Sequence, residues 1–258
     1  MGFNLDNNNF VFKNDNIKII LSSNKGGVSK IDNGNNNMSF NIQQQGVAEN
    51  RIIFANRAEI PLKRSVFANQ THSTNFYEVK AKDCGKGLNS HEDGIDNVDC
   101  LYTFEKNIPL FTFHADCVPV YFYSEEDNLI GIIHAGWQGS VNIITKRVLA
   151  HILELGIDPN NIKVVIGPSI SMKCFECQDD VIDKIKEIPI EGVEKTYKQY
   201  KDRYKADMKL LNKLQVLDLG IPEENIHMSD ICTFKNKHLF SYRKNNDTGR
   251  MVACIYQS

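Results

Sequence analysis

The stretch 107–141 constrains the fold more than any other part of the chain. It contains two apolar, strand-like runs, and each leads to a side chain that can bind a metal. The first run, 110–113, is followed shortly by Cys117, and the second, 129–133, is followed directly by His134. Buried strands commonly deliver functional groups to the edge of a sheet. The sequence therefore predicts a buried sheet with a polar site at one edge.

A turn signal connects the two halves of this stretch. Residues 124–128 read Ser-Glu-Glu-Asp-Asn, a composition typical of a turn. We therefore expect 118–123 and 129–133 to pair as an antiparallel hairpin. Its open end would carry Cys117 and His134, so we expect these two side chains to lie close together.

Length and charge narrow the classes of protein. A chain of 258 residues can bury a sizeable core, and we expect one α/β (α+β) domain that spans 1–258. With 30 basic and 32 acidic residues the net charge is -2, so no basic field favours nucleic acid or an anionic membrane. Apolar runs reach only strand length, whereas a membrane-spanning helix needs about 20 residues. The sequence gives no indication of the oligomeric state.

We expect a cytoplasmic protein. The first ten residues have neither the basic start nor the apolar core of a secretory signal. The seven cysteines are an odd number and are scattered along the chain, which does not indicate a disulfide framework.

Apolar periodicity and turn residues predict the remaining elements. We expect further strands at 10–13, 17–23, 65–69, 76–81, 163–166, 239–242 and 251–256. We expect helices at 47–60, 140–155, 177–188 and 206–219. The polar segment 84–97 is predicted to be a mobile surface loop, and 187–204 a partly ordered excursion.

Three side chains could form a metal site: His72, Cys117 and His134. Two imidazoles and a thiolate suit Zn²⁺ and leave a fourth position open. A nucleophilic pair of Cys117 and His134 is an equally good interpretation of the same residues. His114 is expected to be structural, and the other histidines, at 91, 151, 227 and 238, are expected at the surface.

Two further motifs have simpler explanations. The lone pair Cys174 and Cys177 has the CxxC spacing, but without a second pair it does not indicate a redox centre. Residues 136–140 follow a strand and begin the helix predicted at 140–155. This geometry could present backbone N–H groups to an anion, or it could be only a tight turn.

Nearly the whole chain resembles the YfiH or laccase-domain family, the multi-specificity purine nucleoside phosphorylases once called multicopper polyphenol oxidases. The matching segments are Asn50-Arg51, Gln70-Thr71-His72, Asp99-Cys100-Leu101, His114 to Val120, His134 to Trp137, Gly167 to Ile170, Cys174-Phe175-Glu176, Cys232-Thr233, Phe240 to Arg243 and Gly249 to Met251. The resemblance implies an α/β/β/α sandwich similar to the catalytic domain of cytotoxic necrotizing factor. It also implies that His72, Cys117 and His134 bind zinc, with Cu²⁺ as the alternative metal.

The resemblance also implies an activity. Purine nucleosides (adenosine, inosine, guanosine and methylthioadenosine) would react with inorganic phosphate to give the free base and a ribose 1-phosphate, with adenosine deamination as a second activity. His72, Cys117 and His134 would be the catalytic residues. We expect substrate contacts from five positions: Arg51, Gly136, Gly139, Arg243 and Arg250.

Two positions depart from the family pattern. Gln138 stands where the family usually has Arg, and His114 stands where it usually has Thr. A neutral amide lacks the charge that pairs a guanidinium with phosphate. We therefore expect weaker phosphate binding than in a relative with Arg, and a lower phosphate KM in Gln138→Arg.

The sequence also bears on two activities other than phosphorolysis. Four coppers need roughly eight or more imidazoles, whereas this chain has seven histidines and no His-x-His pair, so a multicopper oxidase is disfavoured. A cysteine-dependent amidase that edits peptidoglycan precursors is the alternative from a different class. In that case Cys117 would be the nucleophile and His134 the base.

Overall fold

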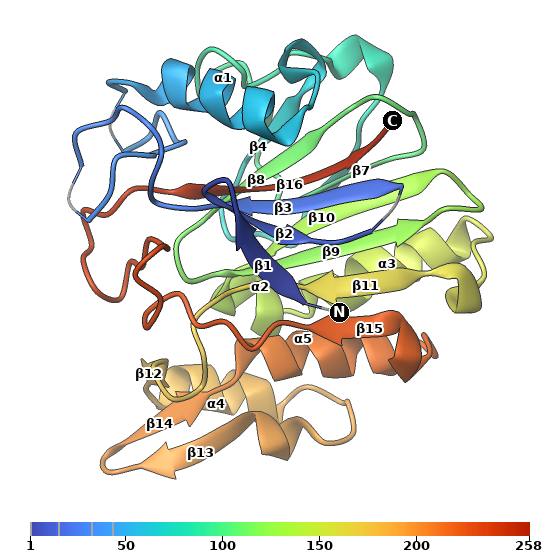
Figure 1. Ribbon diagram of the computed structural model, residues 1–258. Coiled ribbons are helices and arrows are strands. Elements are labelled where there is room, and N and C mark those ends of the chain that lie inside the picture. Colours follow the sequence, from blue (N-terminus) through green and yellow to red (C-terminus); the bar gives the residue numbers. More distant parts are fainter. Residues whose placement is uncertain (1, 15, 32, 43) are drawn as a thin grey trace.

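Two large β-sheets lie face to face in the computed structural model, and helices cover their outer faces (Figure 1). The structure describes residues 2–14, 16–31, 33–42 and 44–258. In these residues the first sheet has the strand order β1 (Phe3–Asp6), β2 (Asn9–Phe12), β3 (Ile17–Ser22), β16 (Met251–Gln257), β8 (Leu110–His114), β4 (Val66–Asn69), β6 (Ile95–Asp96). The second has the order β15 (Ile226–Met228), β11 (Lys163–Ile166), β9 (Val118–Ser124), β10 (Leu129–Ala135), β7 (Cys100–Thr103), β5 (Phe76–Glu78).

A smaller third sheet and the helices complete the fold. The third sheet has the order β12 (Glu176–Cys177), β14 (Arg203–Ala206), β13 (Tyr197–Tyr200). The α-helices in the described residues are α1 (Val47–Ala58), α2 (Trp137–Val141), α3 (Ile144–Glu154), α4 (Asp179–Lys186) and α5 (Met208–Leu217). None of the helices in this part of the chain is long and apolar enough to cross a membrane.

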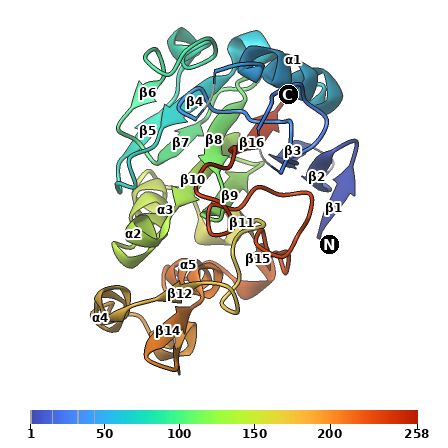
Figure 2. The same cartoon turned by 90° about the vertical axis from the view of Figure 1, so that its left-hand side faces the viewer.

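Alternate side chains of the strands face different cores. Along β16, Ala253 and Ile255 lie in the core between the two large sheets, whereas Val252 and Cys254 pack under α1. Helices α2 to α5 cover the outer face of the second sheet (Figures 1 and 2). Every position of β9, β10 and β16 is buried, which explains their continuous apolar runs. The predicted α/β/β/α sandwich is confirmed.

The strand pairing brings three chain segments to one edge of the sandwich. Strands β4 and β8 are parallel neighbours in the first sheet, so the segments that follow them emerge side by side. After β8 the chain crosses to the second sheet and begins β9, which pairs antiparallel with β10. The turn signal at 124–128 predicted this hairpin, in which His134 lies opposite Pro119.

The helix predicted at 140–155 is two helices. Ile143 has a left-handed backbone with φ 54°, and it separates α2 from α3. The carbonyl of Ser140 would accept a hydrogen bond from residue 144 in a continuous helix. It instead accepts one from the backbone N–H of Ile143 at 3.1 Å and one from the side chain of Gln215 on α5 at 2.9 Å. A local turn and a contact with a distant helix therefore lie at the break in the helix that local periodicity predicts.

Other predicted boundaries also shift because of side-chain contacts. Helix α5 begins at Met208 rather than at 206, because Asp207 caps it by accepting from the backbone N–H of Leu210. The helix predicted at 177–188 begins only at Asp179, since Cys177 belongs to β12. The segment 187–204 contains strand β13 and the start of β14, which pair as a hairpin.

The strand predicted at 239–242 is wrong. Ser241 and the backbone N–H of Arg243 donate hydrogen bonds to the carboxylate of Asp116, which curls this segment into turns. Its apolar residues, Leu239 and Phe240, are buried all the same. The run is therefore a buried loop that leads to the functional edge.

Arg51 on α1 is a buried structural residue. Its Nε donates to the carbonyl of Met38 at 3.0 Å, and its Nη1 donates to the carbonyls of Gly87 at 2.5 Å and Leu88 at 2.9 Å. The guanidinium also stacks over the ring of Phe67 at 4.1 Å. These bonds and strand β6 hold the loop at 84–97, which the sequence had predicted to be mobile.

We expect Arg51→Met to reduce the unfolding free energy by roughly 2 to 4 kcal/mol, because three buried carbonyls would lose their donors. Urea denaturation followed by circular dichroism measures this loss. Arg57→Met, at an exposed position of the same helix, is the control and should change stability by less than about 0.5 kcal/mol. Equal stability of the Arg51 variant and the wild type would contradict a structural role.

Candidate metal centre

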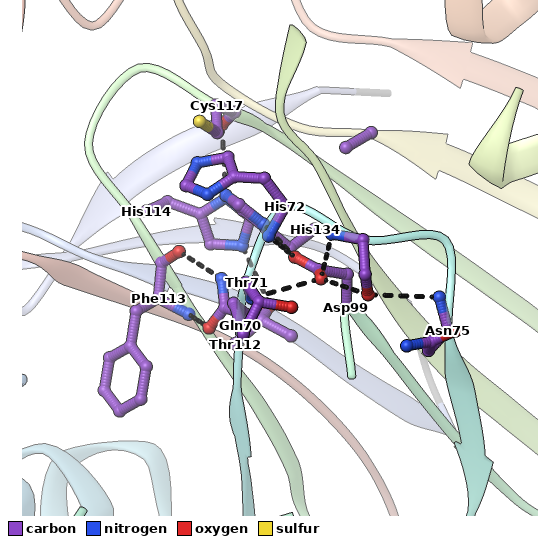
Figure 3. Close-up of polar contacts among 12 residues, drawn as sticks. Gln70, Thr71, His72, Asn75, Asp99, Thr112, Phe113, His114, Cys117 and His134 are labelled. Atoms are coloured by element: carbon purple, nitrogen blue, oxygen red, sulfur yellow. Dashed lines mark hydrogen bonds and ion pairs between the residues drawn. The ribbon is translucent and has the colours of Figure 1, made fainter. Parts of the chain in front are cut away.

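His72, Cys117 and His134 meet where the two large sheets come together. One ligand atom of each lies within 4.8 Å of the others, and the three are the one such group of His, Cys, Asp and Glu among the described residues. His72 follows β4, Cys117 precedes β9 and His134 lies in β10. Figure 3 shows the three side chains. The predicted proximity of Cys117 and His134 is confirmed.

The carboxylate of Asp99 positions two of these residues. It accepts hydrogen bonds from the backbone N–H groups of Thr71, His72 and Ser73, at 3.2, 3.2 and 2.7 Å. It also accepts one from Nδ1 of His134 at 2.8 Å (Figure 3). Nε2 of His134 is thereby left to face Cys117. Asp99 is fully buried, and although burial raises the pKa of its carboxyl, the hydrogen bonds from His134 and Ser73 lower it below the ordinary value.

The backbone at His72 needs this support. His72 has φ 61°, a left-handed conformation that side-chain-bearing residues rarely adopt. The preceding Gln70 side chain bonds both the N–H and the carbonyl of Phe113, each at 2.7 Å, and so extends the pairing of β4 with β8. The segment after β4 is therefore fixed at both ends, by Gln70 and by Asp99.

The Cys117 thiol and the His134 imidazole shift each other's pKa, each favouring the charged form of the other. Burial raises the pKa of the Cys117 thiol, but the charge of His134 and hydrogen bonds from His134 and His72 lower it to about 6. Burial lowers the pKa of His134, whereas the Cys117 thiolate and the Asp99 hydrogen bond raise it to about 9. Both groups are charged between these values; the thiolate is protonated as the pH falls through about 6, and the imidazolium is lost above about 9.

His114 is a neutral neighbour of the centre, as the sequence indicated. Burial, with the charge of His134, lowers the pKa of His114 well below its ordinary value. Its Nδ1 lies 3.1 Å from the carbonyl of Cys117, and its Nε2 lies 2.8 Å from the hydroxyl of Thr112. A neutral ring that donates from Nδ1 and accepts at Nε2 satisfies both contacts.

Gly136 gives the three ligands room to approach. A Cβ at this position would lie 2.7 Å from Cδ2 of His72 and 3.4 Å from Sγ of Cys117. A larger residue would therefore push His72 away from the other two. Gly139 is buried in α2, where a Cβ would lie 3.3 Å from Ile144. Both glycines, predicted as substrate contacts, lie outside the lining of the cavity described below.

The donor set fits a borderline-soft metal ion. Two imidazole nitrogens and one thiolate sulfur are ligands of Zn²⁺ and of copper, and three protein ligands leave a position for a substrate or water. Metal-bound histidines usually donate their other ring N–H to a carboxylate or a carbonyl, and Asp99 accepts this hydrogen bond from His134. The residues present therefore fit a single metal ion.

A cavity of about 710 Å³ opens beside the three ligands, all of which line it. Its wall carries four aromatic side chains and two guanidinium groups: Phe113, Trp137, Phe175, Tyr242, Arg243 and Arg250. This volume is within the range of small-molecule sites, and the mix of apolar walls with few polar groups is typical of them. The sequence had predicted the two arginines here but not the aromatic set.

The two arginines are held by nearby carbonyl groups. Nη2 of Arg243 donates to the carbonyl of Glu176 at 3.1 Å, and Nη1 of Arg250 donates to the carbonyl of Thr248 at 2.7 Å. Burial lowers the pKa of Arg250, while the negative charge of Cys117 raises it. Both arginines therefore lie at the wall of the cavity that the three candidate ligands also line.

Asp116 arranges the loops that carry Arg243. Its buried carboxylate accepts hydrogen bonds from the hydroxyls of Thr233 at 2.5 Å and Ser241 at 2.9 Å, and from the backbone N–H of Arg243 at 2.7 Å. Its own carbonyl accepts from the N–H of Ile170 at 3.0 Å. The sequence gave no signal for this role of Asp116.

Two other predicted positions, Arg51 and Gln138, do not line the cavity, and a third, His91, is more buried than expected. Arg51 lies outside its lining, since it bonds backbone carbonyls beneath α1, so its prediction as a substrate contact is corrected. Gln138 is exposed and is also outside the lining, and α2, which it belongs to, is only five residues long. His91, expected at the surface, is half-buried and lines the cavity.

Comparison with known proteins assigns the chain to a family. The model of the multi-copper polyphenol oxidoreductase laccase family matches residues 18–258. The chain belongs to this family. It is the laccase-like YfiH family that the sequence motifs indicated.

Members of the YfiH family are similar over nearly their whole length. The purine nucleoside phosphorylase of Staphylococcus saprophyticus is 35% identical over 246 residues, which cover 94% of this chain and 92% of that protein. Purine nucleoside phosphorylase YlmD of Bacillus subtilis is 35% identical over 240 residues, or 91% and 86%. The crystal structure of the hypothetical protein YfiH of Bacillus licheniformis superimposes with a TM-score of 0.95, 31% identity and 99% coverage of both chains.

We expect Cys117→Ala to lose stoichiometric zinc, because two imidazoles alone do not make a tight site. Cys174→Ala, at a cysteine outside the cluster, should retain it. Elemental analysis of dialysed, zinc-loaded proteins compares the two. Full zinc content in Cys117→Ala would show that the coordination set is wrong.

We expect Asp99→Asn to weaken zinc binding about 10- to 100-fold, because a neutral amide orients His134 less strongly and bonds the 71–73 segment less tightly. Competition with a chromophoric chelator measures the affinity. Asp96→Asn, at an exposed position three residues earlier, is the control and should bind zinc like the wild type. Identical affinities for all three proteins would mean that Asp99 does not position the ligands.

Proposed function

We propose that this protein is a metal-dependent purine nucleoside phosphorylase. The observation that carries the proposal is one cavity in which the His72, Cys117 and His134 cluster adjoins aromatic walls and two arginines. The names of the relatives from Staphylococcus saprophyticus and Bacillus subtilis support the same activity. Zinc is the proposed metal, with Cu²⁺ as the alternative.

The cavity matches both substrates of phosphorolysis. Phe113, Trp137, Phe175 and Tyr242 offer aromatic faces on which a purine can stack. Arg243 and Arg250 offer charged N–H donors, which bind phosphate oxygens in pairs. A nucleoside and an inorganic phosphate can therefore be held together, which removes much of the entropic cost of their reaction.

The chain's own residues would then organise the reaction. The arginines would hold phosphate against the ribose carbon from which the base departs. Asp99 would keep the ring of His134 fixed and its Nδ1 proton in place. A bound Zn²⁺ would supply a Lewis acid at this end of the cavity.

The substrates we propose are adenosine, inosine, guanosine and methylthioadenosine. Adenosine deamination is proposed as a second activity of the same site, and its support is the resemblance to the family alone. His72, Cys117 and His134 are the proposed catalytic residues, and Arg243 and Arg250 are the proposed substrate contacts.

One observation favours a second candidate function, a cysteine-dependent amidase. Asp99, His134 and Cys117 lie in a hydrogen-bonded row, and the pKa of Cys117 is lowered to about 6. Such a row resembles the arrangement of a nucleophile, its base and an orienting carboxylate. The same thiolate cannot serve as nucleophile while it is a metal ligand, so the two functions make opposite demands on metal.

We expect zinc-loaded protein to release hypoxanthine from inosine only when inorganic phosphate is present, with ribose 1-phosphate formed in equal amount. Chromatography of the products, with and without phosphate, measures this. Arg250→Met should raise the phosphate KM about tenfold or more, because a charge-assisted hydrogen bond contributes roughly 1.5 to 3 kcal/mol.

Arg203→Met removes an exposed arginine that is outside the cavity lining and is the matched control for this KM. Release of hypoxanthine that does not depend on phosphate would exclude the phosphorylase. Cleavage of a muramyl-alanine amide by metal-free protein, and its loss in Cys117→Ala, would favour the amidase.

A further inference from the structure

Cys174 and Cys232 form a pair of thiols that the metal centre does not use. Both are free cysteines; Cys174 is half-buried and Cys232 is buried. Ser171 links them, because it donates hydrogen bonds to the sulfur of Cys232 and its carbonyl accepts one from the N–H of Cys174 at 2.9 Å. Cys232 is 58 positions later in the chain, but the segment that carries it pairs with the segment before Cys174 through a bridge between Ser169 and Cys232. Two distant parts of the chain therefore bring these sulfurs together.

Ser171 gives Cys232 the surroundings of a thiolate. Its backbone N–H donates to Sγ of Cys232 at 3.3 Å, and its hydroxyl donates to the same sulfur at 3.1 Å. Burial raises the pKa of Cys232, but these bonds, the N–H of Lys235 and the Cys174 thiol lower it below the ordinary value. Cys174 is half-buried, and burial raises the pKa of its thiol above the ordinary value.

The neighbour of Cys174 in the CxxC motif is in a different environment. Cys177 lies in β12 and packs in the core beneath α4, with its sulfur 3.9 Å from the carbonyl of Tyr204. Burial raises its pKa to about 11, which leaves it a protonated and weakly reactive thiol. The spacing of the motif therefore indicates the wrong partner for Cys174.

The pair adjoins the cavity. Phe175 and Glu176, directly after Cys174, line it. The guanidinium of Arg243 donates to the carbonyls of Cys174 at 3.4 Å and Glu176 at 3.1 Å. A covalent change at Cys174 would therefore act on the backbone that holds a charged group of the cavity wall.

We propose that Cys174 and Cys232 are a peroxide-sensitive dithiol that forms a reversible disulfide beside the cavity. Two hydrogen bonds to the sulfur of Cys232 favour its thiolate form, and the half-buried Cys174 supplies the second thiol that an oxidant-sensing pair needs. The inference does not depend on the reaction that the cavity performs.

The oxidation has two steps. The Cys232 thiolate attacks one oxygen of hydrogen peroxide; the O–O bond breaks and the departing hydroxide takes up a proton as water, which leaves a sulfenic acid on Cys232. The Cys174 sulfur then attacks this sulfur, its proton goes to the departing hydroxide, and the S–S bond forms. Two thiols lose two electrons, and one peroxide becomes two waters.

The test treats zinc-loaded protein with hydrogen peroxide, blocks the remaining thiols by alkylation and maps the cysteines by mass spectrometry. We expect one disulfide-linked product that contains Cys174 and Cys232, and its loss after treatment with dithiothreitol. In Cys174→Ser the disulfide should be absent, and the sulfenic acid on Cys232 should be trapped by dimedone. In Cys177→Ser the disulfide should form in the same yield as in the wild type.

The proposal is overturned if Cys174 and Cys232 are both recovered as alkylated thiols under peroxide conditions that oxidise a free cysteine peptide. It is also overturned if the disulfide links Cys174 to Cys177. Because the wild-type map alone distinguishes these outcomes, the test does not rely on the folding of any variant. Phosphorolysis is not measured, so failure of the proposed function would leave this result unaffected.

Discussion

The buried carboxylate of Asp99 is the interaction on which the centre depends. It binds the ring of His134 in the second sheet and the backbone on both sides of His72, which follows the first sheet. One side chain therefore sets both the distance between the sheets' edges and the direction of two ligands. Such a buried charge is tolerable only because at least five donors surround it, including the hydroxyl of Ser73.

A second buried carboxylate, that of Asp116, organises the opposite side of the cavity. It gathers Thr233, Ser241 and the backbone of Arg243, and so holds loops from the last third of the chain. The metal ligands and the guanidinium groups thus have separate supports. Their relative positions are fixed because Asp116 is the residue immediately before the ligand Cys117.

Features set by local sequence could be predicted, and features set by distant contacts could not. The β9–β10 hairpin and its two ligands followed from a turn and two apolar runs. The residues alone offered His72 only as one of three candidate ligands, and the family resemblance strengthened that prediction. The place of His72 depends on Asp99 and on a left-handed backbone. The break between α2 and α3 lies where a side chain of α5 bonds the carbonyl of Ser140, and buried Arg51 bonds three carbonyls from other segments. Neither contact leaves a periodic signal in the sequence.

The spread of the ligands along the chain has a consequence for folding order. Cys117 and His134 are joined by a hairpin, so a short-range event brings them together early. We expect His72 to join them only after β7, which directly follows Asp99, has paired with β10 and the two sheets have closed. The unfolded chain therefore does not hold the three ligands together, and an ion that arrives early meets only two of them. A metal that needs all three can bind only the nearly native state, so its binding energy acts on the last stage of folding and on the barrier to opening the sandwich.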